Sequence, residues 1–449
     1  MMAEHSRPGR AWRRGAASLG LILLLVPWLA SQDRPLTLDQ AVALALERNE
    51  QSKANQEGVI AANARVQTAR SYFFPALTST STYTRRAYEV RRLVGESEVV
   101  ISRYNALSEV LGLNWVLFDV RSMSGLQAVK AQRNSDVAAA AENQRQLAFE
   151  VSQAFLATLG VDQLRAASRR RLDYASQNLG AAKARYAAGL VSVNDVTRAE
   201  LEYATAEVGV TQNTGQVETS TLLLGYLLDA PDAVRGQLVV PEFLIEAATA
   251  EAADAEALVE EAQARRLDVG SLRWLASARH HLARTPMLGW VPSLSASGQY
   301  RLTNEAAFNN KTWNWNVGAT LSWSIFDGGV RFGQNKEQKA LARIADLNLQ
   351  AALRRVDVEV RNALVSLDIQ RAAVKQARTA QEVAQKNATE TSELYRQGLA
   401  SALEVADANI SLFEADAALV RQRYSLGVAF LNLEAALGLD PFGKEPRTW

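Results

Sequence analysis

The chain has 449 residues, with 49 Lys and Arg against 48 Asp and Glu, so its net charge of +1 gives no electrostatic basis for binding nucleic acid. It contains no cysteine, which excludes disulfides, thiolate metal sites, a cysteine nucleophile and an acylated lipoprotein cysteine. A chain of this length can form two or three ordinary domains or one elongated domain.

Residues 1–30 have the pattern of a secretory signal peptide. Four arginines, of which Arg14 is the last, precede an apolar run from Leu19 to Val26 that is too short to span a bilayer as a helix. Trp28 stands near the expected cleavage site, where a small residue is usual, so an uncleaved anchor is the alternative. No other segment is an apolar run of membrane-helix length, and any membrane contact of the mature chain is therefore expected to use strands.

The rest of the chain contains an internal repeat. The segment Leu113–Asp119 recurs as Leu321–Asp327, and Arg185–Ser192 recurs as Leu394–Ser401, at offsets of 208 and 209 residues. A repeat of this length indicates two copies of one structural unit. We therefore expect five segments: a signal peptide (1–30), repeat 1 (31–231), a linker outside the helices (232–254), repeat 2 (255–441) and a short tail (442–449).

Each repeat is predicted to contain a shorter helix, two strands and two long helices. No proline falls between Pro75 and Pro231 or between Pro292 and Pro441, and both windows are rich in strong helix formers. The predicted helices lie near 38–71, 123–187, 193–228, 256–284, 329–396 and 402–438. The longest have about 65 residues, which corresponds to about 100 Å. A coiled-coil rod explains such helices equally well, but it explains neither the signal peptide nor the strands.

Segments with period-two alternation lie between these helices, near 77–83, 111–117, 293–302 and 313–325, with a long charged loop at about 86–105. Trp313 to Trp323 is eleven residues, the length of a tilted membrane strand. Aromatic residues near the strand ends have the distribution of a membrane aromatic girdle: Trp115, Trp313, Trp315, Trp323, Tyr83 and Tyr300. A strand of a soluble sandwich is the alternative, although a sandwich usually needs more strands than this chain offers.

Four strands cannot close a barrel, because about eight is the practical minimum. Several chains must then pool their strands to remove the unpaired edges. The sequence therefore predicts an oligomer and leaves open whether it has two, three or four chains.

The turn between the long helices has the same chemistry in both repeats. Each first helix ends at a glycine, Gly189 or Gly398, as helix C-termini often do. Each second helix begins with a Ser-x-x-acid capping box, which ends at Asp195 in repeat 1 and at Glu404 in repeat 2. Capping therefore accounts for both acids without any further role.

Taken together, the repeat, the strand-to-helix junctions Phe118-Asp119 and Phe326-Asp327, and the two Gly-Leu-x-Ser turns resemble the TolC-like outer membrane efflux protein family over about residues 37–441. The resemblance implies a mainly α fold with a membrane β-barrel. The resemblance also implies a homotrimer in which each protomer gives four strands to one shared β-barrel of about twelve strands. Long α-helical hairpins of the three protomers would form an α-barrel tunnel through the periplasm. It also implies the outer membrane of a Gram-negative cell, contact with its lipid, and two partners: a periplasmic adaptor (membrane fusion) protein and an inner-membrane pump of the RND, ABC or MFS type.

The resemblance further implies roles for the turns. By position, the periplasmic gate would consist of Glu404, Asp407 and Asp195, with Tyr395 in the closed-state network. Ala400 stands where some members carry a basic residue, so a salt-bridge latch at that position is in doubt. The adaptor is expected to bind the turns, at Gly189, Leu190, Val191, Ser192, Gly398, Leu399, Ala400 and Ser401. The alternatives are that Asp407 belongs to a solvated helix face and that the two leucines pack inside their own hairpins.

The sequence shows no phosphate-binding loop, Ser/His/acid set or metal-ligand cluster, and we interpret His280-His281 as a surface pair. We therefore expect no enzyme activity, cofactor or metal. The predicted function is a passive outer-membrane exit duct of a tripartite efflux or type I secretion system; a periplasmic adaptor and a structural coiled-coil protein are the alternatives. Drugs, solvents, metal cations and polypeptides all remain candidates for the cargo.

Overall fold

The structure, a computed structural model, describes residues 35–94, 97–234, 236–248, 254–305 and 311–445. All of these belong to one unit, Pro35–Trp449. The expected signal peptide lies outside the described residues, as do parts of the linker and the end of the tail.

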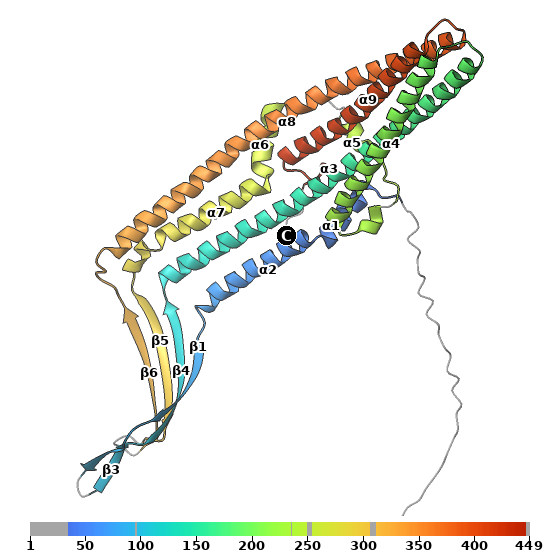
Figure 1. Cartoon of the computed structure of the whole chain (residues 1–449). Coiled ribbons are helices and arrows are strands. Elements are labelled where there is room, and N and C mark those ends of the chain that lie inside the picture. The colour runs from blue at the N-terminus through green and yellow to red at the C-terminus, as the bar shows by residue number, and fades with distance from the viewer. Residues whose placement is uncertain (1–34, 95–96, 235, 249–253, 306–310, 446–449) are drawn as a thin grey trace, which may run out of the picture. The chain divides into compact units, whose positions relative to one another are not determined.

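The two repeats fold into the same series of elements (Figure 1). The first comprises α1 (Leu38–Arg48), α2 (Glu50–Ser71), β1 (Ala76–Arg85), β4 (Asn105–Phe118), α3 (Val120–Ala187) and α4 (Val193–Leu228). The second comprises α6 (Ala255–Arg265), α7 (Leu267–Arg284), β5 (Ser293–Thr303), β6 (Trp313–Ser322), α8 (Val330–Arg396) and α9 (Ala402–Ala436). Shorter helices are η1 (Pro231–Val234), α5 (Glu242–Ala247) and η2 (Met287–Trp290). The predicted internal repeat is confirmed.

Three details differ from the sequence-based expectation. The charged loop at 86–105 contains a separate hairpin of two strands, β2 (Val90–Val94) and β3 (Ser97–Ser102). The strand predicted to reach residue 325 ends at Ser322. The helices predicted as 38–71 and 256–284 are each divided in two, at Asn49 and Arg266, where the backbone becomes extended with ψ of 133° and 128°.

These two breaks are positioned by the ends of the long hairpins. Asn49 donates from Nδ2 to the carbonyl of Leu227 at 3.0 Å, in the last turn of α4. Arg266 donates from Nη1 to the carbonyl of Ala436 at 3.3 Å, in the last turn of α9. Each break therefore satisfies a carbonyl that the helix end leaves without an intrahelical partner.

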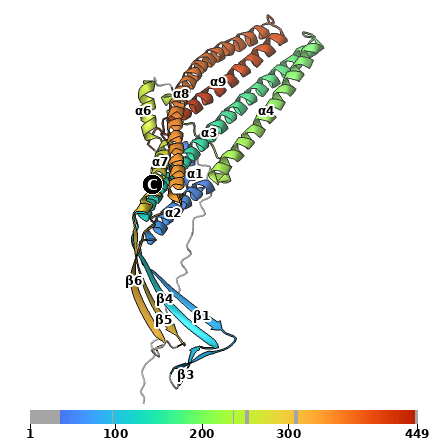
Figure 2. The ribbon, with the colours of Figure 1, turned by 90° about the vertical axis from the view of Figure 1, so that its left-hand side faces the viewer.

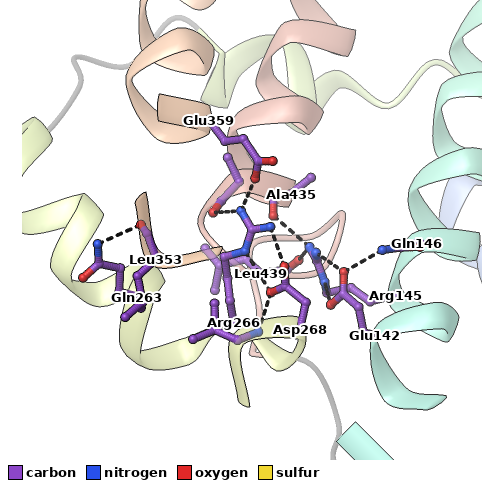
Figure 3. A network of polar contacts seen from close by, with 12 residues as sticks. Glu142, Arg145, Gln146, Gln263, Arg266, Asp268, Leu353, Glu359, Ala435 and Leu439 are labelled. Atoms are coloured by element: carbon purple, nitrogen blue, oxygen red, sulfur yellow. Dashed lines mark hydrogen bonds and ion pairs between the residues drawn. The ribbon is translucent and has the colours of Figure 1, made fainter. Parts of the chain in front are cut away.

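The break at Arg266 is reinforced by a partly buried ionic network (Figure 3). Arg145 of α3 pairs with Glu142 at 2.7 Å and also donates to the carbonyls of Ala435 and Leu439, each at 3.0 Å. Arg266 pairs with Asp268 at 2.8 Å, and its Nη1 donates a hydrogen bond to the carboxylate of Glu359 on α8. These contacts tie α3, α7 and α8 to the end of α9.

The long helices carry the core. α3 has 68 residues and α8 has 67, so each extends about 100 Å. α3 packs against α4, α7 and α9, and α8 packs against α7 and α9. The apolar stripe of α3 buries Val151 and Phe155 completely, and its counterpart on α8 buries Val356 and Val360. Within the described residues, no helix combines the length and apolar character needed to cross a membrane.

The main sheet has the strand order β1-β4-β5-β6, and every neighbouring pair is antiparallel. It lies at one end of the long helices, and the turns α3–α4 and α8–α9 lie at the other end (Figures 1 and 2). Paired residues share a face of a sheet. The register therefore places one apolar row across all four strands: Leu77, Leu113, Gly298 and Val317. The opposite face is mostly Ser, Thr, Asn and Gln.

Candidate functional site at the helix turns

The turn of the first hairpin is built around Gly189, which adopts φ +73°. The Leu190 N–H donates to the carbonyl of Arg185 at 2.9 Å, and the Gly189 N–H donates to that of Tyr186 at 2.9 Å. This pattern closes the end of α3 with a left-handed residue, which glycine adopts without steric cost. The predicted helix end at Gly189 is therefore confirmed.

The turn of the second hairpin repeats this geometry around Gly398, with φ +79°. The Leu399 N–H donates to Leu394 at 2.8 Å, and the Gly398 N–H donates to Tyr395 at 3.1 Å. A Cβ built on either glycine meets no atom within 4 Å. The constraint at both positions is therefore backbone conformation and not space.

Both predicted capping boxes are present. Asp195 Oδ2 accepts from the N–H and the hydroxyl of Ser192 at 3.0 and 2.9 Å. Glu404 Oε2 accepts from the N–H and the hydroxyl of Ser401 at 2.6 and 2.9 Å. The backbone N–H of Ser401, followed by its hydroxyl, lowers the pKa of the Glu404 carboxyl below its usual value. Glu404 is thus held ionised at the start of a helix, where the dipole also favours negative charge.

The remaining proposed gate residues have different surroundings. Asp407 lies exposed on the first turns of α9 and has no ion pair or hydrogen-bond partner among the side chains that the structure describes. Tyr395 is buried, with only 6% of its surface exposed, and it packs against Ala402 and Val405. The structure therefore groups Tyr395 with the apolar interior of its own hairpin.

The two leucines of the turns are open to solvent. Leu190 is 74% exposed and Leu399 is 71% exposed. The alternative that they pack inside their own hairpins is therefore wrong for the isolated chain. Val191 and Ala400 are half-buried beside them.

Arg185 is a residue of this region that the sequence-based reasoning did not single out. Its guanidinium Nη2 donates to the carbonyl of Tyr395 at 2.9 Å, and its Cζ lies 4.0 Å from the centre of the Tyr395 ring. This contact joins the end of α3 to the end of α8. The two copies of the repeat differ at this position, because Leu394 stands in the second copy where Arg185 stands in the first. This difference is the signal in the sequence that could have identified Arg185.

At the other end of the molecule, the predicted girdle residues lie at strand ends. Two indoles make equivalent hydrogen bonds in the two repeats, each to the segment that leads from a helix into a strand. Trp115 Nε1 donates to the carbonyl of Phe73 at 3.0 Å, and Trp323 Nε1 donates to that of Trp290 at 3.1 Å. The register places five of the six predicted aromatics on the apolar face of the sheet: Tyr83, Trp115, Tyr300, Trp313 and Trp315. Tyr300 and Trp313 stack with ring centres 6.3 Å apart.

A sheet with one apolar face at one end of helices about 100 Å long is the arrangement expected of a protein that contacts a membrane through strands. The family described as outer membrane efflux protein matches residues 41–228 and 258–439. The chain belongs to this outer membrane efflux protein family. It is an outer-membrane efflux channel of Gram-negative type and not an enzyme.

Individual proteins show the same relationship. The chain is 23% identical to nodulation protein T of Rhizobium leguminosarum bv. trifolii, over 98% of this chain and 94% of the other. It is 25% identical to outer membrane protein TolC of Vibrio cholerae, over 84% of this chain and 85% of the other. The crystal structure of the CmeC outer membrane channel of Campylobacter jejuni superposes with a TM-score of 0.76 at 16% identity, over 98% of this chain and 95% of the other. The predicted family and the mainly helical fold with a few strands are thus confirmed, and the shared trimeric barrel stays a prediction.

Proposed function

We propose that three copies of this chain form an exit duct for an inner-membrane pump, in a tripartite efflux or type I secretion system. The observation that carries this proposal is the incomplete sheet. Within the described residues, β1 and β6 each pair with one strand only, so the sheet has two open edges beside an apolar face. Pairing β6 of one copy with β1 of the next removes every edge and produces a twelve-stranded barrel in outer-membrane lipid.

The long hairpins then extend into the periplasm as a tunnel, with their turns at its mouth. The exposed side chains of Leu190 and Leu399 are suited to anchor a periplasmic adaptor, because apolar side chains at the centre of an interface supply much of its affinity. The adaptor surface comprises the two turns 189–192 and 398–401. The pump, of RND, ABC or MFS type, supplies the energy for transport.

Carboxylates just beyond the turns form the proposed gate. Asp195 and Glu404 are engaged in their capping boxes, whereas Asp407 is free to face a lumen. Glu404 and Asp407 lie three residues apart on one helix face. Three copies bring six such carboxylates into one ring, which attracts cations. Tyr395 supports this ring from inside the hairpin.

A charged side chain at the turn tests this assignment. Gly398→Glu places a charged side chain, in a left-handed backbone conformation, where the adaptor is proposed to bind. We expect this variant to lose export while its trimers persist on unheated gels. Gly58→Glu is the matched control, because Gly58 lies exposed on α2, away from the turns, with open space around it. Susceptibility of a channel-deficient strain to a panel of pump substrates provides the readout. Full export by the Gly398→Glu variant contradicts the proposed role of the turns.

A further inference from the structure

We propose that Arg185 is a clasp that holds the two hairpin turns of one chain together. The inference rests on the proposed function only in placing these turns at the mouth of a duct. The contact itself is a property of one chain.

The clasp consists of two different interactions made by one guanidinium. Its Nη2 donates to the carbonyl of Tyr395 at 2.9 Å, while its Cζ stacks 4.0 Å from the centre of the tyrosine ring. Tyr395 is itself fixed, because it is buried against Ala402 and Val405 at the start of α9. A planar guanidinium can stack and donate at once, whereas a lysine ammonium cannot reproduce both contacts.

The carbonyl that Arg185 contacts lies in the last turn of α8, where it also accepts from the N–H of Gly398. Positive charge at a helix C-terminus is favourable, since the unpaired carbonyls there carry partial negative charge. Arg185 therefore caps a helix of the second hairpin from the first hairpin.

The repeat makes this clasp one-sided. An offset of 209 residues places Leu394 where Arg185 stands and Tyr395 where Tyr186 stands. Tyr186 is 50% exposed, in contrast to its buried counterpart. The first hairpin (α3–α4) therefore contacts the second hairpin (α8–α9) of the same chain through a cation. The second hairpin has no cation at the matching position that could make the same contact with a neighbouring chain.

Removing the hydroxyl of Tyr395 distinguishes this clasp from a link in which the hydroxyl itself makes the contact. Tyr395 OH is buried and has no hydrogen-bond partner among the described residues. The clasp uses the ring and the backbone carbonyl, both of which remain in Tyr395→Phe. That variant should therefore behave like the parent, whereas Arg185→Ala and Arg185→Lys should loosen the turns.

The test measures the distance between the two turns within one chain. Because the chain has no cysteine, Leu190→Cys and Leu399→Cys introduce two unique spin-label sites. The labelled chain is diluted in unlabelled chain, so that double electron–electron resonance spectroscopy reports the distance between the two spin labels of one chain. We expect one narrow distance distribution for the parent and for Tyr395→Phe. In Arg185→Ala the population with separated turns should rise about tenfold, which is the scale of one cation–π contact with a charge-assisted hydrogen bond.

Arg396→Ala is the matched control, because Arg396 lies at the same level and pairs with Glu393 on its own helix. An Arg185→Ala distribution identical to that of the parent overturns the clasp, as does a Tyr395→Phe variant as loose as Arg185→Ala. Conductance in planar bilayers is measured on the same samples. If the parent forms no pore, the duct proposal fails, while the distance distributions still decide whether the clasp exists.

Discussion

Glu434 is predicted to make the C-terminal turn sensitive to pH. Its side chain lies at the end of α9, 8% exposed, and its Oε2 has no hydrogen-bond partner among the described residues. Burial, followed by the nearby charge of Asp440, raises its pKa from 4.5 to about 7, although Arg265 acts in the opposite direction. A Cβ on Gly443 would lie 3.6 Å from this oxygen, so the turn 440–444 covers the carboxyl.

The size of the effect follows from the pKa difference. Ionising the covered carboxyl costs about 3 kcal/mol, because each tenfold change in proton affinity corresponds to about 1.4 kcal/mol. The pKa is higher in the closed state, so protonation favours that state. The closed turn is therefore fully stable below about pH 4.5, loses stability up to about pH 7 and changes little above it. The opening constant of the turn should rise by roughly 300-fold over this range.

Hydrogen exchange provides the assay. The amides of Phe442 and Lys444 donate to Asp440 at 2.9 and 2.8 Å, and they report opening of the turn. After correction for intrinsic exchange rates, protection in the parent should fall between about pH 4.5 and 7 and change little above pH 7. In Glu434→Gln it should stay nearly constant. Glu445→Gln, at an exposed neighbouring position, should keep the pH dependence of the parent. An unchanged pH dependence in Glu434→Gln would refute the reasoning.

Other substitutions separate capping, gating and the junction with the sheet. Glu404→Gln weakens the cap of α9, so hydrogen exchange of the first amides of α9 should become faster. Because the pKa of Glu404 is lowered, its contribution to the cap should be lost only as the pH falls below about 4.5. Asp407→Asn should leave that exchange unchanged but reduce cation selectivity in bilayer recordings, and equal selectivity in the two proteins would contradict its role as a gate. Arg331 donates to the carbonyls of Gly289 and Ser324 and stacks on Trp290, so Arg331→Ala should destabilise the junction between β6 and α8 by roughly 2–4 kcal/mol. The loss should be visible as faster proteolysis than in Arg343→Ala, which removes an exposed arginine of the same helix.

Much of the fold was predictable because each signal occurs twice. The glycines of the turns, the Ser-x-x-acid boxes and the long proline-free windows all act over a few neighbouring residues, and local chemistry of this kind is readable from a sequence. The alternation around Trp313 likewise fixes which face of the sheet is apolar.

The features that were missed depend on distant partners. The break at Asn49 has a local component, because Asn49 Oδ1 accepts from the Gln51 N–H at 2.8 Å and so caps α2. Both breaks also depend on side-chain contacts with carbonyls of α4 and α9, which are remote in sequence. The hairpin β2–β3 was hidden because charged residues interrupt its apolar pattern. Arg185 looked like an ordinary residue of a helix end until the fold brought it onto Tyr395. Long-range contacts of this kind leave no periodic signal.

The mass of the purified particle, measured by native mass spectrometry in detergent and again after detergent removal, tests the shared sheet most directly. Three copies per particle, stable in detergent and aggregating without it, are predicted from the open edges of β1 and β6 and the apolar face between them. A single chain that stays monomeric in water would contradict the proposal that copies complete one barrel.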